Sequence, residues 1–137
     1  MSLNEEERRT IVGMEIEKSR RTFAEVEILR QAGLWNNIAT RLFYAAFHAV
    51  TALLISEGYP AGSHQGTVIQ FHQHFIKTGI LPKSDGAFYS QMQTLREKAD
   101  YNCTYYATEE DTTPRIAETA AFIDRVIGVI KEQYLLP

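Results

Sequence analysis

The sequence predicts an all-α protein, an up-and-down bundle of four to five helices built on two long antiparallel helices. Apolar residues recur at steps of three and four along most of the chain, which is the spacing of one helix face. No stretch alternates apolar and polar residues for long enough to predict a strand. Because a short link joins the first two periodic segments, these helices are expected to pack antiparallel. We expect residues 1–137 to form a single domain.

The first predicted helix runs from about Asn4 to Ala32. Its apolar stripe comprises Val12, Ile16, Ser19, Phe23 and Val26. Gly33 follows directly and suits the left-handed backbone conformation that ends many helices.

The second predicted helix, from Asn36 to Glu57, is apolar on two faces and is expected to form the centre of the bundle. One face comprises Trp35, Ile38, Leu42, Ala45, Ala49 and Ala52; the other comprises Ala39, Phe43, Ala46, Val50 and Leu54. A single polar line lies between them and comprises Asn37, Arg41, Tyr44, His48 and Thr51. Since Arg41 and His48 would each cost a few kcal/mol at the centre of a bilayer, we expect no membrane span.

Two shorter helices are predicted next. Ser63 is a suitable N-cap for a third helix that continues to about Thr78. Its expected buried residues are Val68, Phe71, Phe75 and Ile76. Ser84 or Asp85 is expected to cap a fourth helix. The apolar stripe of that helix comprises Phe88, Met92, Leu95, Ala99 and Tyr106.

The fifth predicted helix begins at Pro114, because proline is favoured at the first helical position and the preceding residues 108–113 are polar and acidic. We therefore expect residues 108–113 to form a loop. The apolar stripe of the fifth helix comprises Ile116, Ala120, Ile123, Ile127, Ile130 and Tyr134.

Charge and composition exclude several classes of protein. A net charge of −3 argues against indiscriminate nucleic-acid binding, which needs a field of Lys and Arg. Residues 4–9 are charged where a signal peptide would be apolar, so a cytoplasmic protein is expected. Cys103 has no partner for an internal disulfide and is expected to be a small buried side chain.

The histidine spacing argues against a metal site. His72 and His74 are two residues apart on a predicted helix, so they point to different sides and cannot bind one ion. Paired Glu-x-x-His motifs of the di-iron bundles do not occur. We expect neither a metal nor another cofactor.

Two polar lines remain as candidate functional sites. They comprise Arg41, Tyr44 and His48 on the second helix, and Arg96, Asp100 and Tyr101 on the fourth. In one interpretation these groups are structural: Arg96 pairs with Asp100 one turn away, and His48 donates to a backbone carbonyl. In the other they line a cleft or dimer interface in which guanidinium groups bind phosphate.

Four stretches of the sequence carry a resemblance to a known family. They are Arg41-Leu-Phe-Tyr44-Ala-Ala-Phe47-His48-Ala, Ser63-His64-Gln65-Gly66, Phe75-Ile-Lys-Thr-Gly79 and Leu95-Arg96-Glu-Lys-Ala99-Asp100-Tyr101. In order and spacing, over about residues 10–133, the chain resembles the small stand-alone bacterial and archaeal HEPN domain proteins. The resemblance implies a helical bundle, usually a homodimer, often encoded beside a minimal nucleotidyltransferase in what look like toxin–antitoxin pairs.

The resemblance also implies candidate catalytic residues. Ribonucleases of this superfamily use an Arg-x(4–6)-His motif, shared between two subunits and independent of metal. By position, the matching residues are Arg96 and Tyr101, with tyrosine in place of histidine. Because tyrosine is protonated at neutral pH, it is a poor general base. Arg41 and His48 satisfy the spacing but lie on the second helix.

Three functions follow as hypotheses. The first is a dimeric RNA- or nucleotide-contacting partner of a nucleotidyltransferase, with Arg96 and Tyr101 central to the site. Its expected substrate-binding residues are Arg41, Tyr44, His48 and Asp100. The second is a metal-independent endoribonuclease acting as a toxin, and the third is a non-catalytic dimerisation module.

Overall fold

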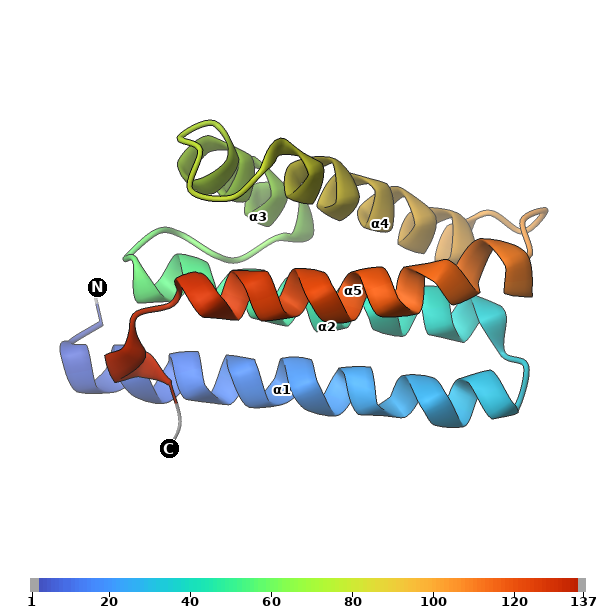
Figure 1. The fold of residues 1–137 in the computed structure, drawn as a ribbon, viewed down its shortest axis with the longest axis horizontal. Coiled ribbons are helices and arrows are strands. Elements are labelled where there is room, and N and C mark those ends of the chain that lie inside the picture. Colours follow the sequence, from blue (N-terminus) through green and yellow to red (C-terminus); the bar gives the residue numbers. More distant parts are fainter. Residues whose placement is uncertain (1–2, 136–137) are drawn as a thin grey trace.

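The computed structural model describes residues 3–135, which form helices and no strand. The helices are α1 (Glu5–Gln31), α2 (Trp35–Ser56), α3 (His64–Phe71), α4 (Lys83–Tyr101) and α5 (Glu109–Val129), with a π-helical turn (His72–Ile76) and a 3₁₀ turn (Glu132–Tyr134). Figure 1 shows α1 and α2 as a long antiparallel pair, α5 in front of α2, and α3 and α4 on the side away from α1. The predicted all-α bundle is confirmed.

Local signals set both ends of α1. The Asn4 side chain accepts from the Glu7 N–H at 2.8 Å, and the Glu7 carboxylate accepts from the Asn4 N–H at 2.9 Å. This reciprocal pair is a capping box. At the other end Gly33 has φ +69°, the left-handed conformation expected of it. Both predicted ends of the first helix are confirmed.

Helix α2 is the core of the bundle, as its two apolar faces predict. It packs against α1, α5, α4 and α3. Although it is long and apolar enough to cross a membrane, 67% of that apolar window is buried inside the bundle, as in the core helix of a soluble protein.

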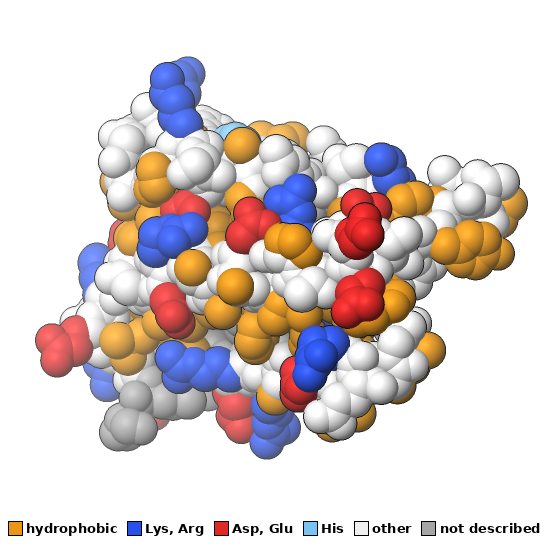
Figure 2. Space-filling model, turned by 45° about the vertical axis from the view of Figure 1, so that its right-hand side comes forward, with side chains coloured by type: hydrophobic (Ala, Val, Ile, Leu, Met, Phe, Trp, Pro, Cys, Tyr) orange, Lys and Arg blue, Asp and Glu red, His pale blue; other side chains and the backbone are white. Residues whose placement is uncertain are grey.

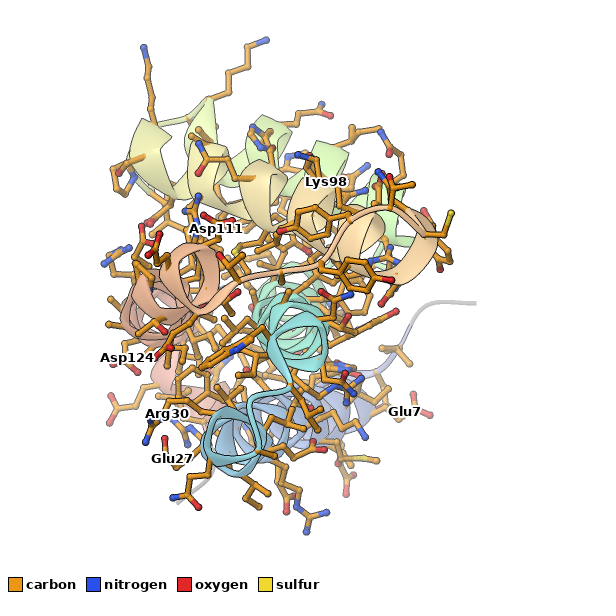
Figure 3. All side chains as sticks on the ribbon, turned by 90° about the vertical axis from the view of Figure 1, so that its right-hand side faces the viewer. Glu7, Glu27, Arg30, Lys98, Asp111 and Asp124 are labelled. Carbon is orange, nitrogen blue, oxygen red and sulfur yellow. The ribbon has the colours of Figure 1, made fainter. Side chains whose placement is uncertain are left out.

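One side of α2 is left uncovered. In the end-on view of Figure 3, α1 lies below α2, α5 to its left and α4 above it, whereas no helix of residues 3–135 covers its right side. Half-buried Arg41, Tyr44, Phe47 and His48 line this open side of α2. Solvent therefore reaches most of the predicted polar line, whereas Thr51, its last residue, is buried at 8% exposure.

The start of α4 differs from the prediction. Pro82 occupies the cap position and makes no side-chain cap. Asp85 lies in the first turn, only 1% exposed, and its carboxylate accepts three hydrogen bonds from Arg125 of α5 at 2.7–3.1 Å. The expectation that Ser84 or Asp85 caps the helix was wrong, because a distant arginine binds the Asp85 carboxylate.

The end of α4 also differs. The helix ends at Tyr101, so Tyr106 lies beyond it and is exposed rather than part of its apolar stripe. Cys103 lies in the same connection and is exposed, which contradicts its expected burial. The helical spacing cannot place residues that lie outside the helix.

Helix α5 begins earlier than expected. Thr108 is its N-cap, and its hydroxyl accepts from the Asp111 N–H at 3.1 Å. Glu109, Glu110 and Asp111 form the first turn, where negative side chains interact favourably with the helix dipole. Pro114 therefore lies inside the helix, and the prediction of a loop before it was wrong.

The third predicted helix is split in two. After Phe71 the backbone widens into the π-helical turn, in which the Lys77 N–H donates to the His72 carbonyl at 2.8 Å. Gly86 of α4 lies against this turn; a Cβ there would lie 3.0 Å from the His72 ring. Phe71 and Phe75 are buried as predicted, whereas Val68 and Ile76 are only partly buried.

Candidate functional site

The candidate site is organised by Arg96, a residue of α4 that is only 5% exposed. Its guanidinium carbon lies 5.2 Å from the centre of the Phe43 ring, 5.9 Å from Tyr44 and 5.5 Å from Tyr101. Aromatic faces at these distances attract a cation. Aromatic rings of α2 and α4 thus surround the positive charge of Arg96.

Three polar side chains meet this guanidinium. Nη1 donates to the Tyr101 hydroxyl at 3.2 Å, and Nη2 donates to Nδ1 of His64 at 2.9 Å. A carboxylate oxygen of Asp100 lies 3.7 Å from Nη1. We refer to Arg96, His64, Asp100 and Tyr101 as the Arg96 cluster. Because Nε of Arg96 is buried without a partner, the surroundings of this charge satisfy it only in part.

His64 enters the cluster from the first residue of α3. The Ser63 hydroxyl caps that helix by accepting from the Gly66 N–H at 2.9 Å, which fixes where α3 begins. The imidazole packs edge-on against Phe43, Tyr44 and Phe47, with ring centres 4.7–5.4 Å apart. This burial lowers the pKa of His64, and the positive charges of Arg96 and His48 lower it further.

A groove of about 470 Å³ adjoins the cluster where α1 ends and α2 begins. Its lining residues are Glu25, Leu29, Asn36, Asn37, Thr40, Arg41, Ala99 and Asp100. Asp100 joins it to the cluster, because its carboxylate also accepts from the Thr40 hydroxyl at 2.7 Å. Arg41 is held loosely: Glu25 lies 3.9 Å from its guanidinium, and the Tyr44 ring lies 5.4 Å away.

Asn36 positions the end of α4 over this groove. Its side chain donates to the Ala99 carbonyl at 3.3 Å and accepts from the Ala107 N–H at 2.6 Å. One amide therefore ties the last turn of α4 and the following connection to the first turn of α2. Arg96 and Tyr101 are kept at a constant distance from α2 in this way.

Comparison with known proteins identifies the family. A family model described as "HEPN domain" matches residues 14–132, most of the chain. The chain belongs to the HEPN domain family. The resemblance found in the sequence is thus confirmed.

The curated relatives of this HEPN domain include two of similar length. "Putative toxin MJ0605" of Methanocaldococcus jannaschii is 31% identical over 130 residues, covering 95% of this chain and 96% of the relative. "UPF0332 protein" of Thermotoga maritima is 28% identical over 115 residues, covering 84% of this chain and 87% of the relative. A second M. jannaschii relative, "Putative toxin MJ0142", is 24% identical over 110 residues, covering 80% of this chain and 75% of the relative.

Five of the six predicted site residues of this HEPN domain converge. Arg96, Asp100 and Tyr101 belong to the Arg96 cluster, and the guanidinium carbons of Arg96 and Arg41 lie 5.9 and 5.4 Å from the centre of the Tyr44 ring. The predicted pairing of Arg96 with Asp100 is confirmed. The functional roles of these residues remain predictions.

His48, the sixth predicted residue, has a different partner from the one expected. Its Nδ1 lies 2.7 Å from a carboxylate oxygen of Glu15 on α1, so the expected bond to a backbone carbonyl was wrong. Glu15 is distant in sequence, and only the packing of α1 on α2 brings it to His48.

His64 is the site residue that sequence reasoning missed. It was noted only as part of the Ser63–Gly66 stretch that supports the family resemblance. Nothing local in that stretch indicates Arg96 as its partner, which lies 32 residues away. This chain therefore has an imidazole beside Arg96 of α4, although Tyr101 stands where the family resemblance predicts the motif histidine.

The face of the molecule that carries α5, away from the open side of α2, is mixed in charge (Figure 2 and Figure 3). Figure 2 shows Lys and Arg side chains interspersed with Asp and Glu on the face it displays, in line with the net charge of −3. Among residues 3–135, no three His, Cys, Asp or Glu side chains are grouped so that they could hold a metal ion. Arg41 and Arg96 place two guanidinium groups at this site.

Proposed function

We propose that this HEPN-family protein is a dimeric, cytoplasmic partner of a minimal nucleotidyltransferase in a toxin–antitoxin-like pair, and that its site binds the phosphates of RNA or of a nucleotide. The observation that carries the proposal is the Arg96 cluster, in which the buried guanidinium of Arg96 donates hydrogen bonds to His64 and Tyr101. The names of two relatives, which describe them as toxins, support the pairing.

The geometry favours phosphate as the ligand. Among the acidic side chains of residues 3–135, only Asp100 at 3.7 Å counters the Arg96 charge and only Glu25 at 3.9 Å counters that of Arg41, so both retain capacity for an anion. The adjoining groove of about 470 Å³ is within the usual size of small-molecule sites. Tyr101, 75% exposed, presents a ring on which a base can stack.

Arg41→Ala tests this site, because Arg41 has few structural contacts. We expect the affinity for a fluorescent single-stranded RNA or a nucleotide to fall about tenfold, the value of one charge-assisted contact. Anisotropy titrations at fixed salt, with chelator present, measure the change. Arg115→Ala is the matched control: Arg115 is similarly exposed, 30% against 34%, and has one loose carboxylate partner at 3.5 Å. Equal effects of the two substitutions would contradict the site.

The proposed assembly rests on the open side of α2. The rings of Tyr44 and Phe47 are only partly buried, with His64 of α3 packed against both, and a second copy related by a two-fold axis would bury their remaining surface. We expect sedimentation at micromolar concentration to give a dimer, and a heavier complex when the proposed nucleotidyltransferase partner is added. A monomer under both conditions would contradict this assembly.

One observation favours a second candidate, a metal-independent endoribonuclease. Although Tyr101 replaces the histidine on α4, His64 lies 2.9 Å from Arg96. An imidazole beside an arginine is the pair of groups that metal-free RNA cleavage needs: a proton-transfer group and a phosphate-stabilising charge. Rapid RNA cleavage in the presence of chelator would favour this candidate. Binding to neither RNA nor nucleotide would leave the third hypothesis, a non-catalytic dimerisation module.

A further inference from the structure

The hydrogen bond between Arg96 and His64 determines where the imidazole carries its proton. A guanidinium group has five N–H donors and no acceptor, so its partner must accept. Nδ1 of His64, which lies 2.9 Å from Nη2 of Arg96, is therefore unprotonated. In a neutral imidazole the proton then lies on Nε2.

Nε2 of His64 points to where a ligand can reach it. It makes no hydrogen bond with residues 3–135, and it is not one of the buried polar atoms that lack a partner. Solvent or a bound molecule is thus its only available acceptor. Nδ1 of His64 and the Tyr101 hydroxyl both accept from the same guanidinium, that of Arg96.

The surroundings oppose a second proton on His64. From α4 it faces the Arg96 charge, with Asp100 and Tyr101 bound to or beside that arginine. From α2 it meets the rings of Phe43, Tyr44 and Phe47 and the nearby His48, which pairs with Glu15 of α1. Burial lowers the pKa of His64 from 6.5, and the charges of Arg96 and His48 lower it further. The ring is therefore neutral at pH 7.

A neutral ring in this tautomer can do little acid–base chemistry. Nε2 carries a hydrogen in place of the lone pair that a general base needs. Loss of that hydrogen would leave an imidazolate anion, so the ring is a poor general acid as well. It can donate one hydrogen bond, and phosphate oxygens accept such bonds from neutral donors.

We propose that His64 is a phosphate-binding residue of this site, acting as a neutral hydrogen-bond donor whose tautomer Arg96 sets. The inference rests on the proposed function and makes it more specific: the Arg96–His64 pair holds a phosphate rather than cleaving RNA. The phosphate can belong to a mononucleotide or to an RNA backbone. Titrations with each probe, a nucleoside monophosphate and a single-stranded RNA without a terminal phosphate, distinguish the two sources.

The variant His64→Gln distinguishes between two roles of His64, that of a hydrogen-bond donor and that of a proton-transfer group. A glutamine can accept from Arg96 through its carbonyl and donate through its amide, but it cannot transfer protons. We expect His64→Gln to keep the affinity of at least one probe within about threefold, whereas His64→Ala lowers it about tenfold. His72→Ala is the control, because His72 is also half-buried and makes one side-chain hydrogen bond, to Ser90 at 3.1 Å on the outer side of α4. The affinity of the His72→Ala variant for each probe should match that of the wild type.

Nitrogen NMR of the free protein tests the tautomer without any ligand. The expected spectrum shows the His64 proton on Nε2 from pH 6.5 to 8, with probe affinity constant over the same range. A proton on Nδ1, or chelator-resistant RNA cleavage that His64→Gln abolishes, would overturn the inference. So would wild-type binding that His64→Ala leaves unchanged, and in that case the proposed function stands. If the wild type binds neither probe, the proposed function fails and this inference fails with it.

Discussion

Arg96→Met is expected to weaken RNA or nucleotide binding by about 100-fold, because it removes the charge and the two hydrogen bonds that hold His64 and Tyr101 in place. Methionine has a similar length and can still pack against the Phe43 and Tyr44 rings. Removing one partner of an ion pair is costly when the remaining charge is buried, but the Asp100 side chain is 29% exposed and can be hydrated. The free energy of unfolding should therefore stay within about 1 kcal/mol of the wild type.

Arg96→Ala provides the contrast for this experiment. It removes the same charge but leaves a cavity beside Phe43 and Tyr44, for which a loss of about 3 kcal/mol is expected. Urea unfolding measures both variants, and anisotropy titration measures their binding. If Arg96→Met folds normally and binds as tightly as the wild type, Arg96 is a structural residue and the proposed site is wrong.

Arg125→Ala is expected to lower the free energy of unfolding by about 3 kcal/mol, the typical effect of removing one partner of a buried ion pair. The reason is an asymmetry in burial: the Asp85 side chain is 1% exposed, whereas that of Arg125 is 48% exposed. Without Arg125, a buried carboxylate loses three hydrogen bonds at 2.7–3.1 Å and cannot turn to water.

Asp85→Ala is the control for that prediction. Arg125 on its own can be hydrated, so the loss should be smaller, about 1–2 kcal/mol. The double variant Asp85→Ala with Arg125→Ala should resemble Asp85→Ala alone, and a double-mutant cycle from urea unfolding gives the coupling. The explanation would be contradicted if Arg125→Ala lowered the free energy of unfolding less than Asp85→Ala does. The buried Asp85 carboxylate would then not depend on Arg125 for its stabilisation.

The parts of the fold that depend on near neighbours in the chain were predictable. The apolar residues of α2 recur at steps of three and four and form two faces, both of which are buried. Asn4 and Ser63 are N-caps because each accepts from an N–H three residues further along. Gly33 has the positive φ that its place after a helix indicated. Periodicity and capping act over one turn of helix, so the sequence around each position contains what decides them.

Predictions failed where a distant residue took the decisive role. Asp85 looked like a cap, but Arg125 of α5 binds it. His48 was expected to donate to a carbonyl, but Glu15 of α1 lies beside it. The wrong start predicted at Pro114 has a local cause. Thr108 and the acidic turn after it begin the helix earlier, and α5 tolerates the one backbone N–H that Pro114 lacks.

The sequence by itself determined the helices, their order and the family, and it indicated that Arg96, Asp100 and Tyr101 belong together, since they lie within one or two turns of α4. Only the tertiary structure brought His64 to Arg96 across 32 residues and joined Asp100 to Thr40 across 60. These meetings depend on how α3 and α4 dock on α2, which is set by the shapes of the buried rings of Phe43, Phe71 and Tyr89. Such packing is a property of the whole core, and no periodicity within one helix encodes it.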